Sequence, residues 1–312
     1  MTDRFSCART SWQLREPLLA TASQVRRWVL VEQPGSWGRD ALTESRLPAD
    51  VGEELRRRCR AVGARPVLIR RCGGRDEGRR RVFVASSAAG SSWLERFDLD
   101  DAADVLDLDL APLAQDRGVG GEALDPFLLL TCTNGSHDAC CAEFGRGVAK
   151  ALDEHLGARS WECSHIGGDR FAANVVALPQ GVYYGRVAPE AAVGIAHLHR
   201  EGLLSLPHYR GRSIWPFDIQ AAETMLRLHV GVDGVEDLVP ATVERPEPGR
   251  SVVEFVAPDG RWRVELEVSA DPQEQVMTCS AASAGHPPRY TLRGVSPVDD
   301  AVPGVPEAGP GR

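Results

Sequence analysis

The first third of the chain alternates apolar, strand-like runs with one amphipathic stretch. A strand is predicted over residues 25–32 (VRRWVLVE), and a loop rich in Pro and Gly follows it. Residues 48–61 carry apolar side chains at four-residue steps between charged ones, which indicates a helix. Strand-like runs at 66–71 and 81–87 come next. The predicted order is therefore strand, helix, strand, strand.

The middle of the chain repeats this order. The pattern predicts a strand over 126–131, an amphipathic helix over 139–156 and the start of a second strand at 161–164. Residues 174–187 are typical of a hairpin that turns at a Pro-Gln-Gly sequence, and a helix follows over 189–200. The repetition indicates an internal duplication. A β-α-β-β-α order is typical of an α/β fold with helices layered on a mixed sheet, as in thioredoxin-like proteins.

In the last third of the chain, the sequence pattern predicts fewer helices and strands. A helix is expected over 220–230, and a hairpin over 251–268 turns at Asp259-Gly260. The tail 297–312 is rich in Pro and Gly with little to bury, so we expect it to be disordered.

Composition narrows the class of protein. The chain has 312 residues, of which 43% are hydrophobic, and a formal net charge of −8. This is enough apolar content for a substantial core, but nucleic-acid binders need a basic footprint, so we expect no nucleic-acid partner. There is no apolar leader after Met1 and no run of about 18 apolar residues. We therefore expect a cytoplasmic protein that does not associate with membranes.

Cysteines gather in the middle of the chain. Four of the eight lie within the 32 residues from Cys132 to Cys163. In a reducing compartment, cysteines bind metals, perform redox chemistry or lie buried more often than they form disulfides. The other four are expected to be buried core residues: Cys7, Cys59, Cys72 and Cys279.

Two of the clustered cysteines flank a loop between a strand and a helix. Cys132 ends the predicted strand, and Cys141 lies nine residues later, in the first turn of the helix. Asp138 is the expected N-cap of this helix. A helix N-terminus carries partial positive charge and therefore favours thiolate over thiol. The loop thus directs two candidate thiolate ligands toward one point.

A second loop carries the remaining candidate ligands. Cys163, His165 and Asp169 follow the second strand, around a Gly167-Gly168 pair that lets a bulky group approach the backbone. Cys163 and His165 are two residues apart, so on an extended strand they are expected to point to the same face.

Two segments carry a resemblance to a known family. CTNGSHDACCAEFGRGVAKAL and WECSHIGGDRFAANVVALPQGVYYGRV resemble the sucrase/ferredoxin-like family, whose core is related to thioredoxin-like 2Fe-2S ferredoxins. The resemblance implies a thioredoxin-like ferredoxin domain over 123–213. A degenerate thioredoxin-like repeat over 1–122 would precede it, and a small β-rich extension over 214–296 would follow it.

The resemblance also implies ligands for a 2Fe-2S cluster. The family places two Cys nine residues apart on the first loop, which correspond to Cys132 and Cys141. Its second pair, four residues apart, falls on His165 and Asp169, where the family has His or Cys at the last position. A carboxylate is a hard ligand and rare on iron-sulfur iron, so ligand softness favours Cys163 in place of Asp169.

Three ligand sets therefore stay open. The first set is Cys132, Cys141, His165 and Asp169, and the favoured second set has Cys163 in place of Asp169. In the third, Cys140 replaces Cys141 in either of these sets. With any of these sets, the resemblance implies an iron-sulfur electron carrier whose partner is a reductase or an oxidase.

Two other functions are weighed against electron transfer. A thiol-redox protein would pair Cys132 with Cys140 or Cys141, but the Cys-x-x-Cys spacing of thioredoxin active sites is absent. Two Cys, one His and a fourth ligand also suit a zinc site, so a metal-binding or metal-free scaffold is the other alternative. A glycosidase is not expected, because it requires two carboxylates held across a sugar.

Overall fold

The computed structural model of the chain describes residues 5–74, 78–124, 127–281 and 283–298. The tail that the sequence predicts to be disordered, 297–312, lies outside these ranges from residue 299 onward.

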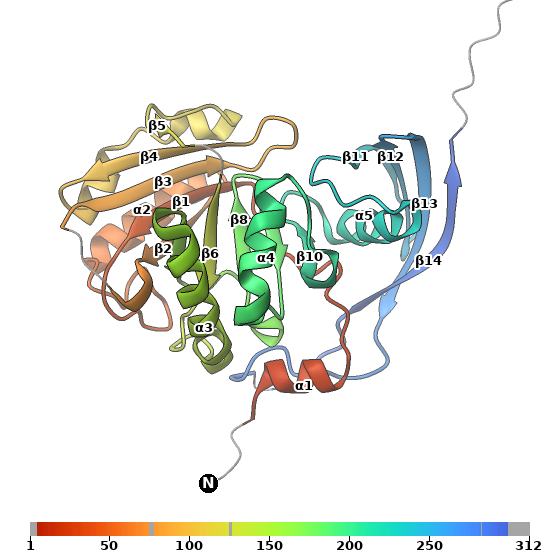
Figure 1. Cartoon of the computed structure of the whole chain (residues 1–312), viewed down its shortest axis with the longest axis horizontal. Coiled ribbons are helices and arrows are strands. Elements are labelled where there is room, and N and C mark those ends of the chain that lie inside the picture. Colours follow the sequence, from red (N-terminus) through yellow and green to blue (C-terminus); the bar gives the residue numbers. More distant parts are fainter. Residues whose placement is uncertain (1–4, 75–77, 125–126, 282, 299–312) are drawn as a thin grey trace, which may run out of the picture.

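Within the described residues the chain forms five α-helices and fourteen strands. Figure 1 labels most of them. The helices are α1 (Cys7–Gln13), α2 (Ala49–Ala61), α3 (Ala139–Leu156), α4 (Pro189–Arg200) and α5 (Phe217–Val230). The strands of the N-terminal half are β1 (Arg27–Glu32), β2 (Ala64–Arg70), β3 (Arg80–Ser86), β4 (Trp93–Leu99) and β5 (Glu122–Ala123). Those of the central half are β6 (Leu128–Cys132), β7 (Ser160–Cys163), β8 (Val175–Leu178), β9 (Val182–Tyr184) and β10 (Tyr209–Arg212). The C-terminal strands are β11 (Val239–Glu244), β12 (Arg250–Ala257), β13 (Gly260–Ala270) and β14 (Pro288–Pro297).

The α/β class is confirmed, and ten strands form one mixed sheet in the order β10-β9-β8-β6-β7-β2-β1-β3-β4-β5. In the N-terminal half, β1 pairs parallel with β2 and antiparallel with β3, which pairs antiparallel with β4. In the central half, β6 makes the same pairings with β7 and β8, and β8 pairs with β9. The two halves therefore share one strand order, and the antiparallel β2–β7 pair joins them.

The expected domain boundary between residues 122 and 123 falls inside β5, and the two segments on either side of it contribute to one sheet. Where β2 and β7 meet, Arg70 pairs with Glu162, which also accepts a hydrogen bond from Thr133 at 2.9 Å. The central part of the chain therefore folds against the N-terminal part rather than apart from it.

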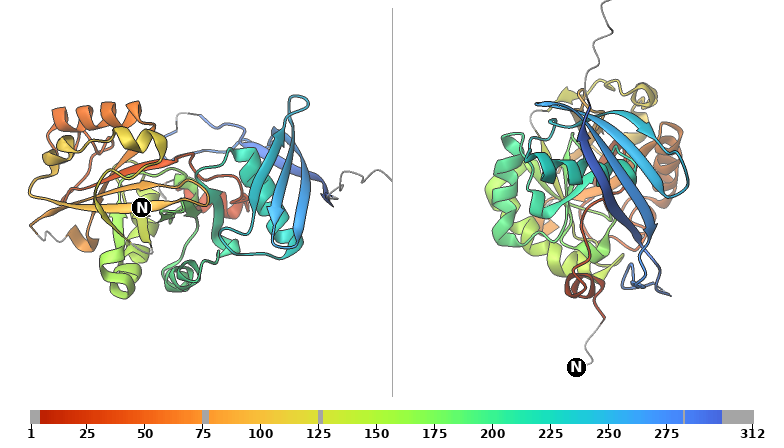
Figure 2. Two further views of the ribbon diagram at one scale, coloured as in Figure 1. Left: turned by 90° about the horizontal axis from the view of Figure 1, so that it is seen from above. Right: turned by 90° about the vertical axis from the view of Figure 1, so that its right-hand side faces the viewer.

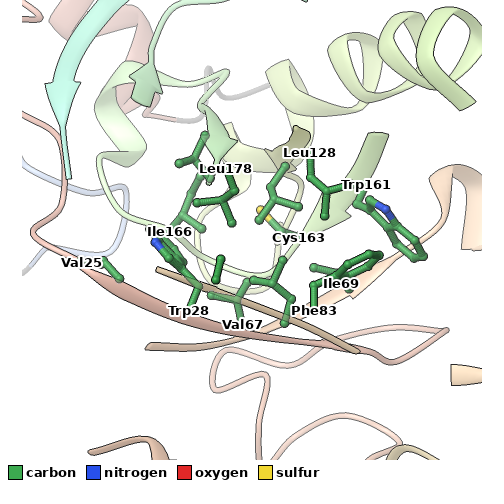
Figure 3. Close-up of a cluster of buried hydrophobic side chains, with 14 of the residues drawn as sticks. Val25, Trp28, Val67, Ile69, Phe83, Leu128, Trp161, Cys163, Ile166 and Leu178 are labelled. Carbon is green, nitrogen blue, oxygen red and sulfur yellow. The ribbon is translucent and has the colours of Figure 1, made fainter. Parts of the chain in front are cut away.

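The sheet curls, so its two halves face each other across a shared core. Figure 3 shows Val67 and Phe83 of the N-terminal half facing Leu128 and Cys163 of the central half. Helix α2 covers the outer face of the N-terminal half, and α3 and α4 cover that of the central half, on the other side of the molecule (Figure 2).

The C-terminal extension is a four-stranded antiparallel sheet, β11-β12-β13-β14, packed against α5. The predicted hairpin corresponds to β12 and β13, although its turn lies at Pro258-Asp259, one residue earlier than expected. The sequence pattern did not predict the flanking strands β11 and β14, nor β4, β5 and the short helix α1.

Helix α1 lies far from the rest of the N-terminal half in the structure. It packs beside the segment that connects β13 and β14, below the central half in Figure 1. The beginning of the chain and its C-terminal part therefore meet at the start of α3, where the cysteines gather.

Candidate metal centre

The strand β6 and the helix α3 position the first pair of candidate ligands. Cys132 is the last residue of β6 and Cys141 lies in the first turn of α3, and both side chains are about 1% exposed. The helix can approach the strand end because residue 145 is a glycine. A Cβ on Gly145 would lie 2.2 Å from the Cys132 carbonyl oxygen.

The predicted N-cap of α3 is confirmed. The Asp138 side chain accepts a hydrogen bond from the backbone N–H of Cys140 at 2.9 Å, and the backbone of Asp138 is extended. This cap starts the helix one residue after Asp138, and thereby sets which directions Cys140 and Cys141 face.

The second loop is shaped by its two glycines. Gly167 and Gly168 have φ angles of 98° and 82°, a region that L-residues rarely adopt. The groups that approach these two glycines are protein side chains. A Cβ added to Gly167 would lie 2.2 Å from Ser23 Oγ, and one added to Gly168 would lie 2.2 Å from Arg210 Nη2. The buried Arg210 also donates to the Gly167 carbonyl oxygen at 3.2 Å. Arg210 therefore stabilises this loop, and the sequence pattern did not predict that role.

These two loops bring three candidate ligands together. The sulfur atoms of Cys132 and Cys141 and a ring nitrogen of His165 all lie within 4.8 Å of one another. Asp169 borders this group, with its Oδ1 3.3 Å from Cys141 Sγ and 3.0 Å from His165 Nδ1. His137, from the first loop, stacks on His165 with ring centroids 3.7 Å apart.

Charge is distributed unevenly in this group. Hydrogen bonding from Cys141 and the nearby His165 outweigh burial and hold the pKa of Cys132 well below its usual value. The neighbouring Cys132, together with burial, raises the pKa of Cys141. Burial alone would lower the pKa of His165, but Asp169 and Cys132 raise it to about 9. Burial alone would raise the pKa of Asp169, but His165 and Cys141 hold it below its usual value. Negative charge therefore resides on Cys132 and Asp169, where a bound cation would be stabilised.

Cys163 is placed differently from the expectation. It is the last residue of β7, fully buried, and its side chain is part of the core in Figure 3. The chain bends at Ser164, so the two-residue alternation of a strand does not extend to His165. Within the described residues, the metal-ligand group that contains Cys132 includes His165 but not Cys163.

Cys140 also faces away from Cys132. Its sulfur lies 3.8 Å from Cys7 Sγ and 3.4 Å from Cys279 Sγ, in a second group that includes Asp138. Cys7 and Cys279 were expected from the sequence to be buried core residues, and Cys7 is buried whereas Cys279 is half-buried. Nothing local could have revealed their proximity, because they are 272 residues apart.

All three members of the first group suit an iron-sulfur cluster. Two thiols and one imidazole are ligands that iron-sulfur iron accepts, whereas the bordering Asp169 carboxylate is harder than the family pattern. His165 Nδ1 is buried and faces Asp169 Oδ1 at 3.0 Å, so the carboxylate orients the imidazole beside the two thiols.

No helix in the described part of the chain is both long and apolar enough to cross a membrane.

Known proteins match parts of this chain. One relative is altered inheritance of mitochondria protein 32 from Meyerozyma guilliermondii, 33% identical over 95 residues. The alignment covers 27% of this chain and 34% of the relative, so the chain matches about a third of that protein's length. No solved structure matches significantly. The sucrase/ferredoxin-like profile matches residues 18–211, more than half of the chain, and includes both loops of the candidate centre. The chain therefore belongs to the sucrase/ferredoxin-like family.

Proposed function

We propose that the protein is an electron carrier with a 2Fe-2S cluster held by Cys132, Cys141, His165 and Asp169. The observation that carries this proposal is the convergence of two buried cysteines and His165 within 4.8 Å, in a chain of this family. When bound, such a cluster accepts and donates one electron at a time. We further propose that each half of the large sheet is thioredoxin-like, an interpretation that their shared strand order supports.

Asp169 is proposed as the fourth ligand in place of the favoured Cys163. Its carboxylate lies 3.0 Å from His165 and 3.3 Å from Cys141, whereas Cys163 packs in the shared core. The proximity of Asp169 to Cys141 and His165 therefore opposes ligand softness, which favours Cys163, the β7 residue that pairs with Cys132 in the sheet. The ligand role of Cys163 stays a prediction that its own variant tests.

The proposed centre lies near the surface on one side. His165 is 23% exposed and, with His137, lines a pocket of about 410 Å³ that also contains Arg39 and Arg65. Arg65 donates to the His165 carbonyl oxygen at 2.8 Å. We propose that a reductase or oxidase docks over this pocket, where the imidazole edge offers the shortest path for an electron. The cytoplasmic location remains a prediction from the sequence.

A thiol-redox function is less well supported. Cys132 combines a lowered pKa with a neighbouring thiol, as an exchange pair requires. However, both sulfurs belong to side chains about 1% exposed, so a protein disulfide cannot reach them for attack.

The experiment is anaerobic purification followed by visible absorption and EPR of the dithionite-reduced protein, with iron and sulfide analysis. We expect visible charge-transfer bands and an S = 1/2 signal in the wild type, and loss of both in Cys132→Ala. A colourless protein that contains no iron, even after expression with ample iron and sulfide, contradicts the proposal and leaves the scaffold function.

Two further variants identify the fourth ligand. Asp169→His restores the family pattern, so we expect it to keep the cluster and shift its EPR g values, whereas Asp169→Ala loses it. Cys163→Ala is the matched variant and is expected to retain the cluster, because the proposal gives the fourth position to Asp169, which lies 3.3 Å from Cys141 Sγ. If Cys163→Ala loses iron and Asp169→Ala does not, Cys163 is the ligand.

A further inference from the structure

A second group of ligands lies beside the proposed iron-sulfur centre. Three sulfur atoms, of Cys7, Cys140 and Cys279, come from the start of the chain, the first turn of α3 and the segment before β14. Their pairwise distances are 3.8 Å, 3.4 Å and 3.5 Å. Three thiols brought this close from distant segments form a nearly equilateral triangle.

We propose that Cys7, Cys140 and Cys279, with Asp138, bind a single zinc ion. A tetrahedral site with Zn–S bonds of about 2.3 Å has sulfur–sulfur edges of about 3.8 Å, close to the three distances observed. A thiolate-rich donor set selects a soft or borderline ion such as Zn²⁺ over Mg²⁺ or Ca²⁺. The spacing of the sulfurs is therefore that of one mononuclear site.

Asp138 is positioned to provide the fourth ligand. Its Oδ2 lies 3.7 Å from Cys7 Sγ, and its two oxygens accept hydrogen bonds from the backbone N–H groups of Cys140 and Cys279. These two bonds, of 2.9 Å and 2.7 Å, orient the carboxylate toward the sulfurs, as partners of ligating carboxylates commonly do. Asp138 thus has a second role beyond capping α3.

The group does not suit a second 2Fe-2S cluster. Such a cluster needs two pairs of ligands, one pair on each iron, whereas here all three sulfurs share a single triangle. Nor does it merge with the first centre, because Cys140 and Cys141 are adjacent in α3 and project about 100° apart around the helix axis. One helix start therefore supplies a ligand to each of two separate sites.

The surroundings favour a closed structural site. Cys7 and Cys140 are at most 1% exposed and pack with Ala8 and Ala172, while Cys279 is half-buried. The ion would tie α1 and the segment before β14 to the start of α3, as their proximity in Figure 1 illustrates. Because Cys141 lies in the same helical turn, the zinc would also hold the first centre's ligand in place.

The test is made in a background that lacks the first centre. Full-length Cys132→Ala/Cys141→Ala/His165→Ala protein is purified from zinc-supplemented cells, and its metal content is measured by mass spectrometry. We expect about one zinc per chain. Adding Cys279→Ser, at a half-buried position, is expected to lower zinc at least about tenfold, since it removes one of three thiolates. Cys72→Ser, which alters a cysteine outside both groups, serves as the matched control and should retain zinc.

Cobalt substitution provides a readout independent of zinc recovery. Co²⁺ added to the metal-free background variant should give the intense visible bands of tetrahedral thiolate coordination, and Cys279→Ser should abolish them. The proposal is overturned if the background variant binds neither ion with all three thiols titratable, or if two of the three form a disulfide. Zinc that survives Cys279→Ser equally overturns it. Failure of the iron-sulfur proposal would not affect this result, because the background lacks that centre.

Discussion

The imidazole of His199 is buried between two polar neighbours. Its Nδ1 lies 3.4 Å from the Tyr184 hydroxyl and its Nε2 lies 3.2 Å from the Gln180 amide oxygen. Burial, with a smaller repulsion from the Arg212 guanidinium, lowers the pKa of His199 to about 4. This histidine therefore folds in its neutral form and resists protonation.

We expect His199 to make stability depend on pH. As pH falls through about 6.5, the unfolded chain protonates His199 while the folded protein does so only near 4. Its contribution to stability is thus present above pH 6.5 and is lost toward pH 4, by about 3 kcal/mol at most. Urea unfolding from pH 7.5 to 4.5 should show a shallower decline for His199→Gln than for the wild type.

The exposed His229→Gln controls for loss of a histidine as such. Equal declines in the wild type and in His199→Gln would contradict a neutral, buried imidazole.

At the scale of elements, the contact between β6 and α3 builds the first centre. The helix was predicted with its correct bounds, because its apolar side chains repeat at helical spacing and Asp138 caps it. The closeness of helix and strand was not predictable, since it depends on the missing side chain of Gly145 meeting the Cys132 carbonyl. The periodicity of side chains along the chain thus determines that α3 forms. The distance between α3 and β6 depends on how the two elements pack.

Gly145→Ala should therefore weaken the centre. An added methyl 2.2 Å from the Cys132 carbonyl oxygen must displace α3, at a cost of about 1–3 kcal/mol. We expect a lower melting temperature and reduced iron content, measured on protein purified in parallel with the wild type. Gly194→Ala is the matched control in α4, because nothing lies within 4 Å of its added Cβ.

Gly194→Ala is expected to stabilise the protein slightly, because Ala favours the helix by up to about 1 kcal/mol. If Gly145→Ala gains stability like Gly194→Ala and keeps its iron, the close contact is not what positions Cys132.

At the scale of the molecule, the two halves of the large sheet share one core. Phe83 of β3 packs edge-on against Trp161 of β7, with ring centroids 5.5 Å apart. The β2–β7 pair continues the sheet across the same junction. We infer that the halves unfold together, although each repeats the same strand order.

Phe83→Ala should destabilise the central half as well as the N-terminal half. Loss of this buried ring costs about 3–5 kcal/mol, and a shared core distributes the cost. Hydrogen exchange should therefore accelerate in peptides from both β1 and β8. Leu228→Ala, at a side chain 67% exposed, is the control. Acceleration confined to the N-terminal half would show that the halves are independent.

The sequence by itself determined the features that depend on neighbours along the chain. These are the α/β class, the repeated strand and helix order, the cap at Asp138, and the pairing of Cys132 with Cys141 through the family resemblance. Each follows from side-chain periodicity or from a short motif, which residues within about one turn or one loop specify.

Only the tertiary structure decided which distant groups meet. It placed Arg210 of β10 against the loop at Gly167, whose carbonyl oxygen accepts a hydrogen bond from Arg210 at 3.2 Å. It also brought Cys7 and Cys279 together across 272 residues. Such contacts depend on how whole elements pack, and the spacing of residues in a single sequence carries no record of that packing.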